Sequence, residues 1–443
     1  MKFKAIVILF EFIILVNQFY SQDTWIEQQS GVNVSLNCAT SFYSSPPAVH
    51  GWICGNNGTV LSTTNGGTNW NNVSSGIPVS VNLTTIYGFT NDYSRAVTSG
   101  VNNSGQAVIY RTSNGGQTWQ NTFIQPNGNI YGFAELSPFP QNMLLIGKPV
   151  GGRWTIWRST NEGITWDSSG LYMPQTGSET GFNNSVFCLE MKVWFGTNNS
   201  RIYYSSNIGY NWIMQSTYPV VNSTNIWFQF LLTERAVGYG LSGSNAILKT
   251  NDLGASWQPV FTLPSGEITG ISGLPSQPNK NWYCIDNKIF EGTNGVNWNL
   301  QYTAPGGNYT HISNNKNTMS NIWAVRNNGG ISKFIRSTGI NYISTEIPES
   351  FSLSQNYPNP FNPTTNFEFS IPLLRGVSEG RGVFVNLTIY DAMGRVVETL
   401  HNGELKSGIY KADWNASNFP SGVYFYRLSA VSFSETKKMI LTK

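Results

Sequence analysis

The chain has 443 residues, of which only 11% are charged, while aromatic residues make up 14% and glycine occupies 44 positions. Glycine and small polar residues favour turns and aromatic residues favour strands, so this composition argues against a mainly helical protein. A net charge of +3 provides no basic field for phosphate backbones, which disfavours a nucleic-acid partner. We therefore predict an all-β fold.

The first residues have the layout of a secretory signal peptide, which we place at residues 1–21. Lys2 and Lys4 precede an apolar run from Ala5 to Val16, and small polar residues follow. This run is shorter than the ~20 apolar residues that span a bilayer. We expect a mature chain that begins near Gln22 or Asp23, has no membrane span, and is not a lipoprotein because no cysteine lies near the cleavage point.

Four cysteines occur in the chain, and only Cys38 and Cys54 are near each other in sequence. Two interpretations stay open for an exported protein: a Cys38–Cys54 disulfide, or buried free thiols on strands. A zinc site is not expected, because His50 and His311 show no ligand spacing.

One eight-residue pattern recurs along the chain, with its tryptophans 41 to 49 residues apart. It has a hydroxyl residue, then Asn or Asp two positions later, Gly two after that and Trp three further on. Such a pattern predicts a tight hairpin, because the amide or carboxylate accepts backbone N–H groups and Gly adopts angles costly for other residues. The residues concerned are Thr63, Asn65, Gly67, Trp70, Thr112, Asn114, Gly116, Trp119, Ser159, Asn161, Gly163, Trp166, Ser205, Asn207, Gly209, Trp212, Thr250, Asp252, Gly254, Trp257 and, in a degraded copy, Gly295 and Trp298.

Short apolar strands precede each copy, so each unit of roughly 45 residues holds about four strands, as in one blade of a β-propeller. A seventh unit at 321–335 has two strands but no tryptophan after it. The sequence at 24–37 is similar to that at 69–82, and Trp25 occupies the position that corresponds to Trp70. We therefore predict seven blades over 22–340, closed by the N-terminal strand that carries Trp25.

This pattern resembles the Asp-box, or BNR, repeat of sialidases, Asp-box xyloglucanases, sortilin-type receptors and Ycf48-like photosystem assembly factors. The resemblance covers residues 24–335. In that family the box lies at the blade periphery, away from the central axis where ligands bind, so the box residues are expected to be structural. Four of the five good copies have Asn where the family has Asp, Asp252 being the exception, which disfavours calcium binding.

After a linker predicted at 341–350, the composition changes. Alternating apolar residues, such as Val385, Leu387 and Ile389, indicate strands, and the segment from Asp391 to Gly394 indicates a turn between two of them. We predict a small, Ig-like β-sandwich over 351–443.

The same segment resembles the type A C-terminal sorting domain of the type IX secretion system in Bacteroidetes-related bacteria. This resemblance implies recognition by an outer-membrane translocon and a secreted or cell-surface location. Beside Gly408, Trp414, Ser421 and Val423, the matching positions are Pro358, Asn359, Pro360, Phe361, Asn362, Pro363, Tyr390, Asp391, Gly394, Gly422, Tyr424, Lys437 and Lys438.

A glycosidase needs two carboxyl groups facing each other. The acids of the propeller region outside the boxes and the closing strand are spread one or two per blade, and their spacing does not indicate a pair. Among them, the candidates are Glu135, Glu179, Glu190, Glu234, Glu267 and Asp286. We find no phosphate-binding loop and no nucleophile motif. We therefore predict no catalytic, cofactor-binding or metal-binding residues.

Two other residue classes have alternative roles. Four arginines fit strand-end surface positions better than a carboxylate clamp: Arg95, Arg153, Arg201 and Arg235. Six tryptophans outside the boxes fit core packing better than stacking on sugars: Trp154, Trp157, Trp194, Trp227, Trp282 and Trp323.

Taken together, the sequence predicts a monomeric, exported seven-bladed propeller that binds or scaffolds without catalysis, and whose ligand at the axis is a glycan or a protein. A secreted glycan hydrolase, sialidase-like or xyloglucanase-like, is the alternative. A Ycf48-like assembly factor is a third hypothesis, which conflicts with export beyond the outer membrane.

Overall fold

A computed structural model describes residues 23–43, 49–89, 92–136, 141–230, 236–242, 245–274, 277–293, 296–313, 322–335, 339–344, 346–373, 382–416 and 419–443. Over these ranges the chain is all-β and forms two compact units. One unit is Thr24–Ile335 and the other includes Arg336–Lys443. The predicted signal peptide at 1–21 lies outside the described residues.

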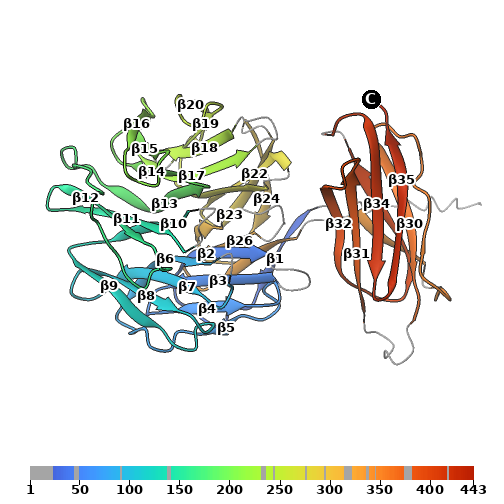
Figure 1. Cartoon of the computed structure of the whole chain (residues 1–443), viewed down its shortest axis with the longest axis horizontal. Helices are drawn as coiled ribbons and strands as arrows, with labels where there is room; N and C mark the ends of the chain where they lie inside the picture. The colour runs from blue at the N-terminus through green and yellow to red at the C-terminus, as the bar shows by residue number, and fades with distance from the viewer. Residues whose placement is uncertain are drawn as a thin grey trace, which may run out of the picture. The chain divides into compact units, whose positions relative to one another are not determined.

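The described residues of the first unit form seven antiparallel sheets, numbered here in chain order (Figure 1). Sheet 1 has β2 (Leu36–Tyr43), β3 (Val49–Gly55), β4 (Val60–Thr63) and β5 (Asn71–Asn72). Sheet 2 has β6 (Asn82–Gly88), β7 (Ala96–Val101), β8 (Gln106–Thr112) and β9 (Gln120–Pro126). Sheet 3 has β10 (Ile130–Glu135), β11 (Met143–Val150) and β12 (Arg153–Ser159).

Sheets 4 to 6 have four strands each. They are β13 (Gly181–Leu189), β14 (Lys192–Thr197), β15 (Arg201–Ser205) and β16 (Ile213–Ser216), then β17 (Ser223–Phe230), β18 (Ala236–Ser242), β19 (Ala246–Thr250) and β20 (Gln258–Thr262), then β21 (Ile268–Leu274), β22 (Gln277–Ile285), β23 (Lys288–Thr293) and β24 (Asn297–Thr303). Sheet 7 combines β25 (Tyr309–Ile312), β26 (Trp323–Arg326) and β27 (Ile331–Ile335) with the N-terminal β1 (Thr24–Gln28).

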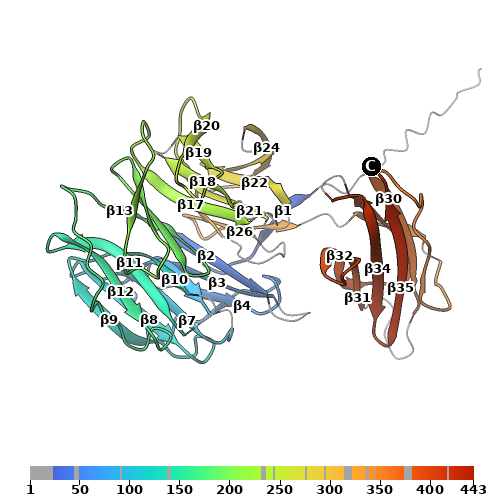
Figure 2. The same ribbon diagram turned by 45° about the horizontal axis from the view of Figure 1, so that its top comes forward.

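The seven sheets lie in a closed ring. The first strands of successive sheets contact one another in the order β2, β6, β10, β13, β17, β21, β25, and β25 contacts β2. Strand β1 completes sheet 7 by pairing with β27, with Trp25 opposite Phe334 as the ring-closure prediction requires. Figures 1 and 2 label β1, in blue, and β26 of the same sheet, in which β27 lies between the two. Closure leaves no open edge between the first and last sheets.

Sheet 3 departs from the four strands expected of each repeat. In place of a fourth strand, the segment after its box makes two isolated bridges to β12, from Asp167 to Arg158 and from Pro174 to Arg153. Leu171 and Met173 of this segment are buried in the core between sheets 3 and 4. The segment therefore covers the edge of β12 with a loop, anchored by apolar side chains instead of a continuous ladder.

The second unit consists of two four-stranded sheets around one apolar core. The first has the order β28 (Gly339–Ser344), β33 (Gly408–Asn415), β30 (Thr364–Ile371), β29 (Ser352–Leu353), and the second β32 (Val396–Leu405), β31 (Val383–Asp391), β34 (Gly422–Ala430), β35 (Phe433–Leu441). Phe367 of the first sheet and Tyr426 of the second meet with ring centroids 4.4 Å apart.

The predicted boundary between the units was wrong. Residues 341–350 were expected to be a linker and 22–340 to be propeller, yet Gly339–Ser344 forms β28 of the C-terminal unit. Its partner is β33, in which Ala412 pairs with Ile340. Because that partner lies about seventy residues downstream, the local sequence gives no sign of the pairing.

Candidate functional site

Each eight-residue box begins at the end of the third strand of a sheet, and its polar side chains form their hydrogen bonds within the turn. In all five good copies the Gly N–H donates to the leading hydroxyl at 2.8–3.0 Å. That hydroxyl donates to the Asn or Asp side-chain oxygen at 2.7–3.0 Å. The same Asn or Asp oxygen also accepts the backbone N–H of the residue four positions after it, at 2.9–3.0 Å. The boxes therefore act as turns, as predicted from their residue types.

Each box also faces the sheet before its own. Gly116 has a φ of +83°, and a Cβ added to it would lie 2.7 Å from Cβ of Val73 in the segment after β5. Gly209 has a φ of +87°, and its added Cβ would lie 2.8 Å from Leu144 on β11. The glycines are thus required by backbone angle and by close approach together.

The box tryptophans fill the spaces between sheets. Trp70 meets Trp323 of sheet 7 edge-on at 5.3 Å, and Trp119 meets Trp52 of sheet 1 at 5.9 Å. The others lie in or against the apolar clusters between sheets, namely Trp166, Trp212, Trp257 and Trp298. The remaining residue of the degraded copy, Gly295, lies outside the described residues.

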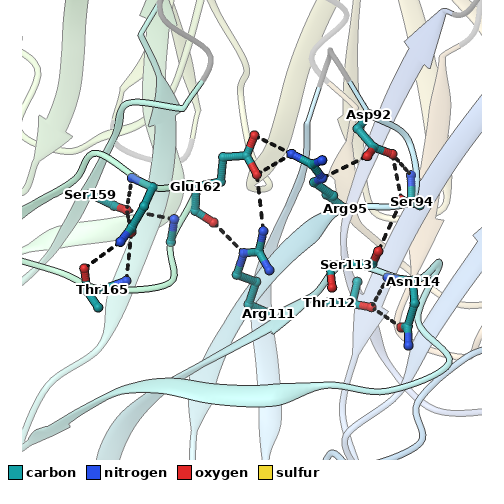
Figure 3. Close-up of polar contacts among 12 residues, drawn as sticks. Asp92, Ser94, Arg95, Arg111, Thr112, Ser113, Asn114, Ser159, Glu162 and Thr165 are labelled. Atoms are coloured by element: carbon teal, nitrogen blue, oxygen red, sulfur yellow. Dashed lines mark hydrogen bonds and ion pairs between the residues drawn. The ribbon is translucent and has the colours of Figure 1, made fainter.

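Glu162, in the third box, is the centre of an ion-pair cluster between sheets 2 and 3 (Figure 3). Arg95 Nη1 donates to both carboxylate oxygens, at 2.7 and 2.6 Å. Arg111 donates from Nη2 to Oε2 at 3.2 Å and from Nε to the backbone oxygen of Glu162 at 2.8 Å. Asp92 pairs with Arg95 Nε at 2.8 Å, and the Ser94 hydroxyl holds the pKa of Asp92 below its usual value.

A second buried cluster closes the ring. Glu27 on β1 accepts from Arg326 Nη1 at 3.1 Å, from the Ser332 hydroxyl at 2.7 Å and from the Tyr302 hydroxyl at 2.8 Å, and it pairs with Arg326 Nη2. The neighbouring Gln28 accepts from the indole N–H groups of Trp70 and Trp323 at 3.0 and 2.9 Å. Sequence reasoning placed Glu27 in the closing strand but gave no sign of these partners.

Two other buried acids of the propeller, Glu179 and Glu135, are hydrogen-bonded to tyrosines. Glu179 accepts from Thr197 at 2.8 Å and from the Tyr203 hydroxyl at 3.0 Å, and Glu135 accepts from the Tyr87 hydroxyl at 2.8 Å. A tyrosine acts as a nucleophile in some glycoside hydrolases, and it does so as the phenolate. Here burial raises the pKa of Tyr203 and raises that of Tyr87 well above its ordinary value, which opposes phenolate formation.

The other acids singled out from the sequence lie apart from these pairs. Glu190 and Glu267 are exposed, and Asp286 sits at the turn between β22 and β23 with a φ of +47°. Glu234 lies outside the described residues.

The arginines and tryptophans divide in a similar way. Arg95 and Arg201 were predicted to be surface residues at strand ends. Both instead pair with carboxylates of the protein, Arg201 with buried Glu179 at 3.3 Å. Arg153 donates to the Ser168 hydroxyl at 3.4 Å, and Arg235 lies outside the described residues. Core positions are taken by Trp154, Trp194, Trp282 and Trp323, Trp157 is half-buried against Phe123, and the side chain of Trp227 is outside the described part of the chain.

The innermost strands provide a recurrent feature that the sequence did not reveal. Every one of the seven has a bulge where it enters its sheet, and in six the register skips one residue, namely Asn37, Thr84, Tyr131, Thr224, Thr269 and Thr310. All six are uncharged, and all but Tyr131 are half-buried. They lie at equivalent positions on the innermost strands, and we call this set of residues the axial ring. Several of their polar groups are hydrogen-bonded within the protein, since the Asn37 amide donates to the Leu83 oxygen at 2.6 Å and the Tyr131 hydroxyl bonds with Thr180 in the core between sheets 3 and 4.

The seventh bulge, in β13, is longer and spans the residues between Gly181 and Val186. Within it Asn184 has a φ of +63°, and its side-chain amide donates to the backbone oxygens of Asn37 at 3.1 Å and Thr84 at 3.3 Å. This residue therefore links sheet 4 directly to sheets 1 and 2. In an asparagine-rich chain, nothing local marks Asn184 for this role.

The residues matched to a sorting signal form two groups in the C-terminal unit. Asn359 Oδ1 accepts from the Ile440 N–H, and the Phe361 oxygen accepts from the Thr442 N–H, both at 3.0 Å. The run that also contains Pro358, Pro360, Asn362 and Pro363 is thus fastened to the last strand, with Phe361 buried and its flanking residues Pro360 and Asn362 exposed.

The second group lies on the hairpins. Asp391 Oδ1 accepts the N–H groups of Met393 and Arg395 at 2.9 Å, and Gly394 has a φ of +78°. Tyr424, after Gly422, is buried against Trp414, with centroids 5.5 Å apart. On β35, Lys437 pairs with Glu435 at 3.0 Å and Lys438 is exposed.

Comparisons with known proteins support the propeller fold of the first unit and the sorting-domain assignment of the second. Residues 355–442 match the family described as the secretion system C-terminal sorting domain. No curated protein sequence matches the chain. Similar solved structures include YCF48 bound to D1 peptide (14% identity, TM-score 0.53, 70% of this chain and 96% of that one), YCF48 from Cyanidioschyzon merolae (15%, 0.52, 70% and 98%) and an ancestral GH74 enzyme (12%, 0.53, 94% and 63%).

At these identities the structural likeness establishes a β-propeller fold and nothing about ligands. The matched sorting domain marks the protein as one that type IX secretion carries to the bacterial cell surface or beyond. Within the described residues, no helix has the length and apolarity needed to cross a membrane.

Proposed function

We propose that the exported chain is a seven-bladed Asp-box propeller that acts without catalysis, as a binding or scaffold module at the cell surface or outside the cell. The observation that carries this proposal is the uncharged axial ring. Propellers bind ligands at the axis, and the innermost strands here carry uncharged residues at their bulges, an environment that suits neutral partners better than charged ones. A glycan or an extended polypeptide segment satisfies such groups, and YCF48, whose fold is similar, is described as bound to a peptide.

The contacts of the charged residues favour the same conclusion. Glu135 and Glu179 are buried and hydrogen-bonded to tyrosines, and Glu162 and Glu27 neutralise arginines between sheets. A carboxylate held in this way stabilises the ring and is poorly placed to donate or accept a proton from substrate.

Binding is tested with the purified exported protein on arrays of glycans and of extended peptides. Replacing Thr269 in the axial ring by Arg should abolish any binding found, because it places a bulky charge among neutral groups. Ile213→Arg, on the exposed outer strand β16, is the matched control and should bind like the unaltered protein. Equal loss in both variants, or in neither, would reject an axial site.

A secreted glycan hydrolase is the second candidate, favoured by the fold likeness to an ancestral GH74 enzyme. Incubation of the exported protein with a panel of glycosides separates the two proposals. Turnover that disappears on substitution of a propeller carboxylate would overturn the non-enzymatic proposal. A Ycf48-like assembly role is not favoured, because export carries the chain away from photosynthetic membranes.

The route of export is tested by removing residues 336–443, which includes β28 because that strand belongs to the C-terminal unit. The shortened chain should accumulate in the periplasm. Its undiminished appearance on the surface or in the medium would contradict sorting by this unit.

A further inference from the structure

Cys38 and Cys54 lie directly opposite each other in sheet 1, where β2 pairs with β3. Directly opposed residues in antiparallel strands have Cα atoms about 4.5–5.5 Å apart. Disulfides join residues whose Cα atoms are about 4.4–6.8 Å apart. The backbone at this pair therefore meets the distance requirement of a disulfide without rearrangement. The other two cysteines, Cys188 and Cys284, lie on sheets 4 and 6.

Both thiols project to the same side, toward sheet 2. The Cys38 thiol contacts the Ile86 oxygen on β6 at 3.9 Å, and Cys54 is hydrogen-bonded with Thr98 on β7. Both belong to the apolar cluster between sheets 1 and 2. The two sulfurs are therefore neighbours in one closed compartment, and all four cysteine side chains are buried.

We propose that Cys38 and Cys54 form an intramolecular disulfide in the exported protein. The periplasm, through which the chain passes, is oxidising. Two thiols lose two protons and two electrons, and the electrons reduce the disulfide of a periplasmic thiol oxidoreductase to its dithiol. One S–S bond forms within the chain and one breaks in the oxidant.

The reaction takes place before sheet 2 covers the pair. In the folded chain, burial raises the pKa of the Cys38 thiol to about 11 and that of Cys54 well above its ordinary value, so almost no thiolate is present to attack. The bond then links adjacent strands of the sheet next to the closing one, and restricts the chain before the ring closes.

Thiol counting on the exported protein tests the proposal. Protein collected from the producing cells is quenched in acid, unfolded, alkylated without reductant and analysed by mass. We expect two alkylated thiols, and a linked peptide pair containing Cys38 and Cys54 that separates after reduction. Four alkylated thiols, or a linked pair that includes Cys188 or Cys284, would overturn the proposal.

Two variants make the count independent of a single measurement. With the disulfide present, Cys188→Ser should show one alkylated thiol, because only Cys284 remains free. With the disulfide absent, the same variant shows three. Cys54→Ser leaves three cysteines and should show three alkylated thiols in either case. The disulfide therefore predicts one thiol more than in the unaltered protein, whereas its absence predicts one fewer. Should either variant fail to be exported, the count on the unaltered protein decides alone.

Discussion

Removal of the Glu27 carboxylate is the sharpest test of how the ring closes. The Arg326 side chain is only 3% exposed, and that of Glu27, at 28%, neutralises it where β1 joins the other strands of sheet 7. Breaking a buried pair costs about 3–5 kcal/mol because a charge is left without a partner. Since the Glu27 side chain is partly exposed, we expect Glu27→Ala to lower the free energy of unfolding by about 3 kcal/mol, the low end of that range.

The assay is urea unfolding of the full chain, followed by tryptophan fluorescence, in a double-mutant cycle with Arg326→Met. In the Arg326→Met background, removal of the carboxylate leaves no arginine unpaired, so it should cost about 1 kcal/mol or less, the value of the remaining hydrogen bonds of Glu27. Exposed Glu267 provides the control, and Glu267→Gln should change stability by less than about 0.5 kcal/mol. An equal cost of Glu27→Ala in both backgrounds would refute the reasoning.

Three further outcomes are expected. Gly115→Ala and Gly116→Ala both place Ala at positive φ, which costs about 1–2 kcal/mol of stability. Only Gly116 approaches the preceding sheet closely, so Gly116→Ala should have a clearly lower urea midpoint of unfolding than Gly115→Ala. Equal midpoints would exclude the close approach. Burial lowers the pKa of His311 to about 4. The stability that comes from keeping this histidine neutral is therefore fully present above pH 6.5, and the free energy of unfolding should fall by about 3 kcal/mol as the pH drops from 6.5 to 4. The urea midpoint of His311→Gln should not show this decrease with pH. Asn359→Ala should speed hydrogen exchange at the Ile440 amide, whose N–H it accepts, and an unchanged rate would contradict that bond.

The sequence predicted the parts of the fold that depend on neighbours within one turn. A box needs only eight residues to complete its hydrogen bonds, as the set from Thr112 to Trp119 shows, so its period indicated the repeating sheets. Trp25 could be matched with Trp70 for the same reason. The C-terminal hairpin at Asp391–Gly394 was likewise visible, because the Asp side chain and the Gly backbone angle are local requirements.

Features whose partners are distant in sequence were decided by the tertiary structure alone. Glu162 was interpreted only as a box residue, yet Arg95 and Arg111 reach it from the preceding sheet. Gln28 joins two indoles that lie 42 and 295 residues away in sequence. Strand β28 was missed because β33 follows it so far downstream.

The sequence by itself thus determined the repeating turn, the closing strand and the sorting segment, since each is specified by short-range chemistry. Only the closed ring decided which uncharged residues surround the axis, which acids are neutralised and which cysteines face each other. Those relations arise when strands from distant parts of the chain pair and desolvate the same side chains, and no local pattern encodes that pairing.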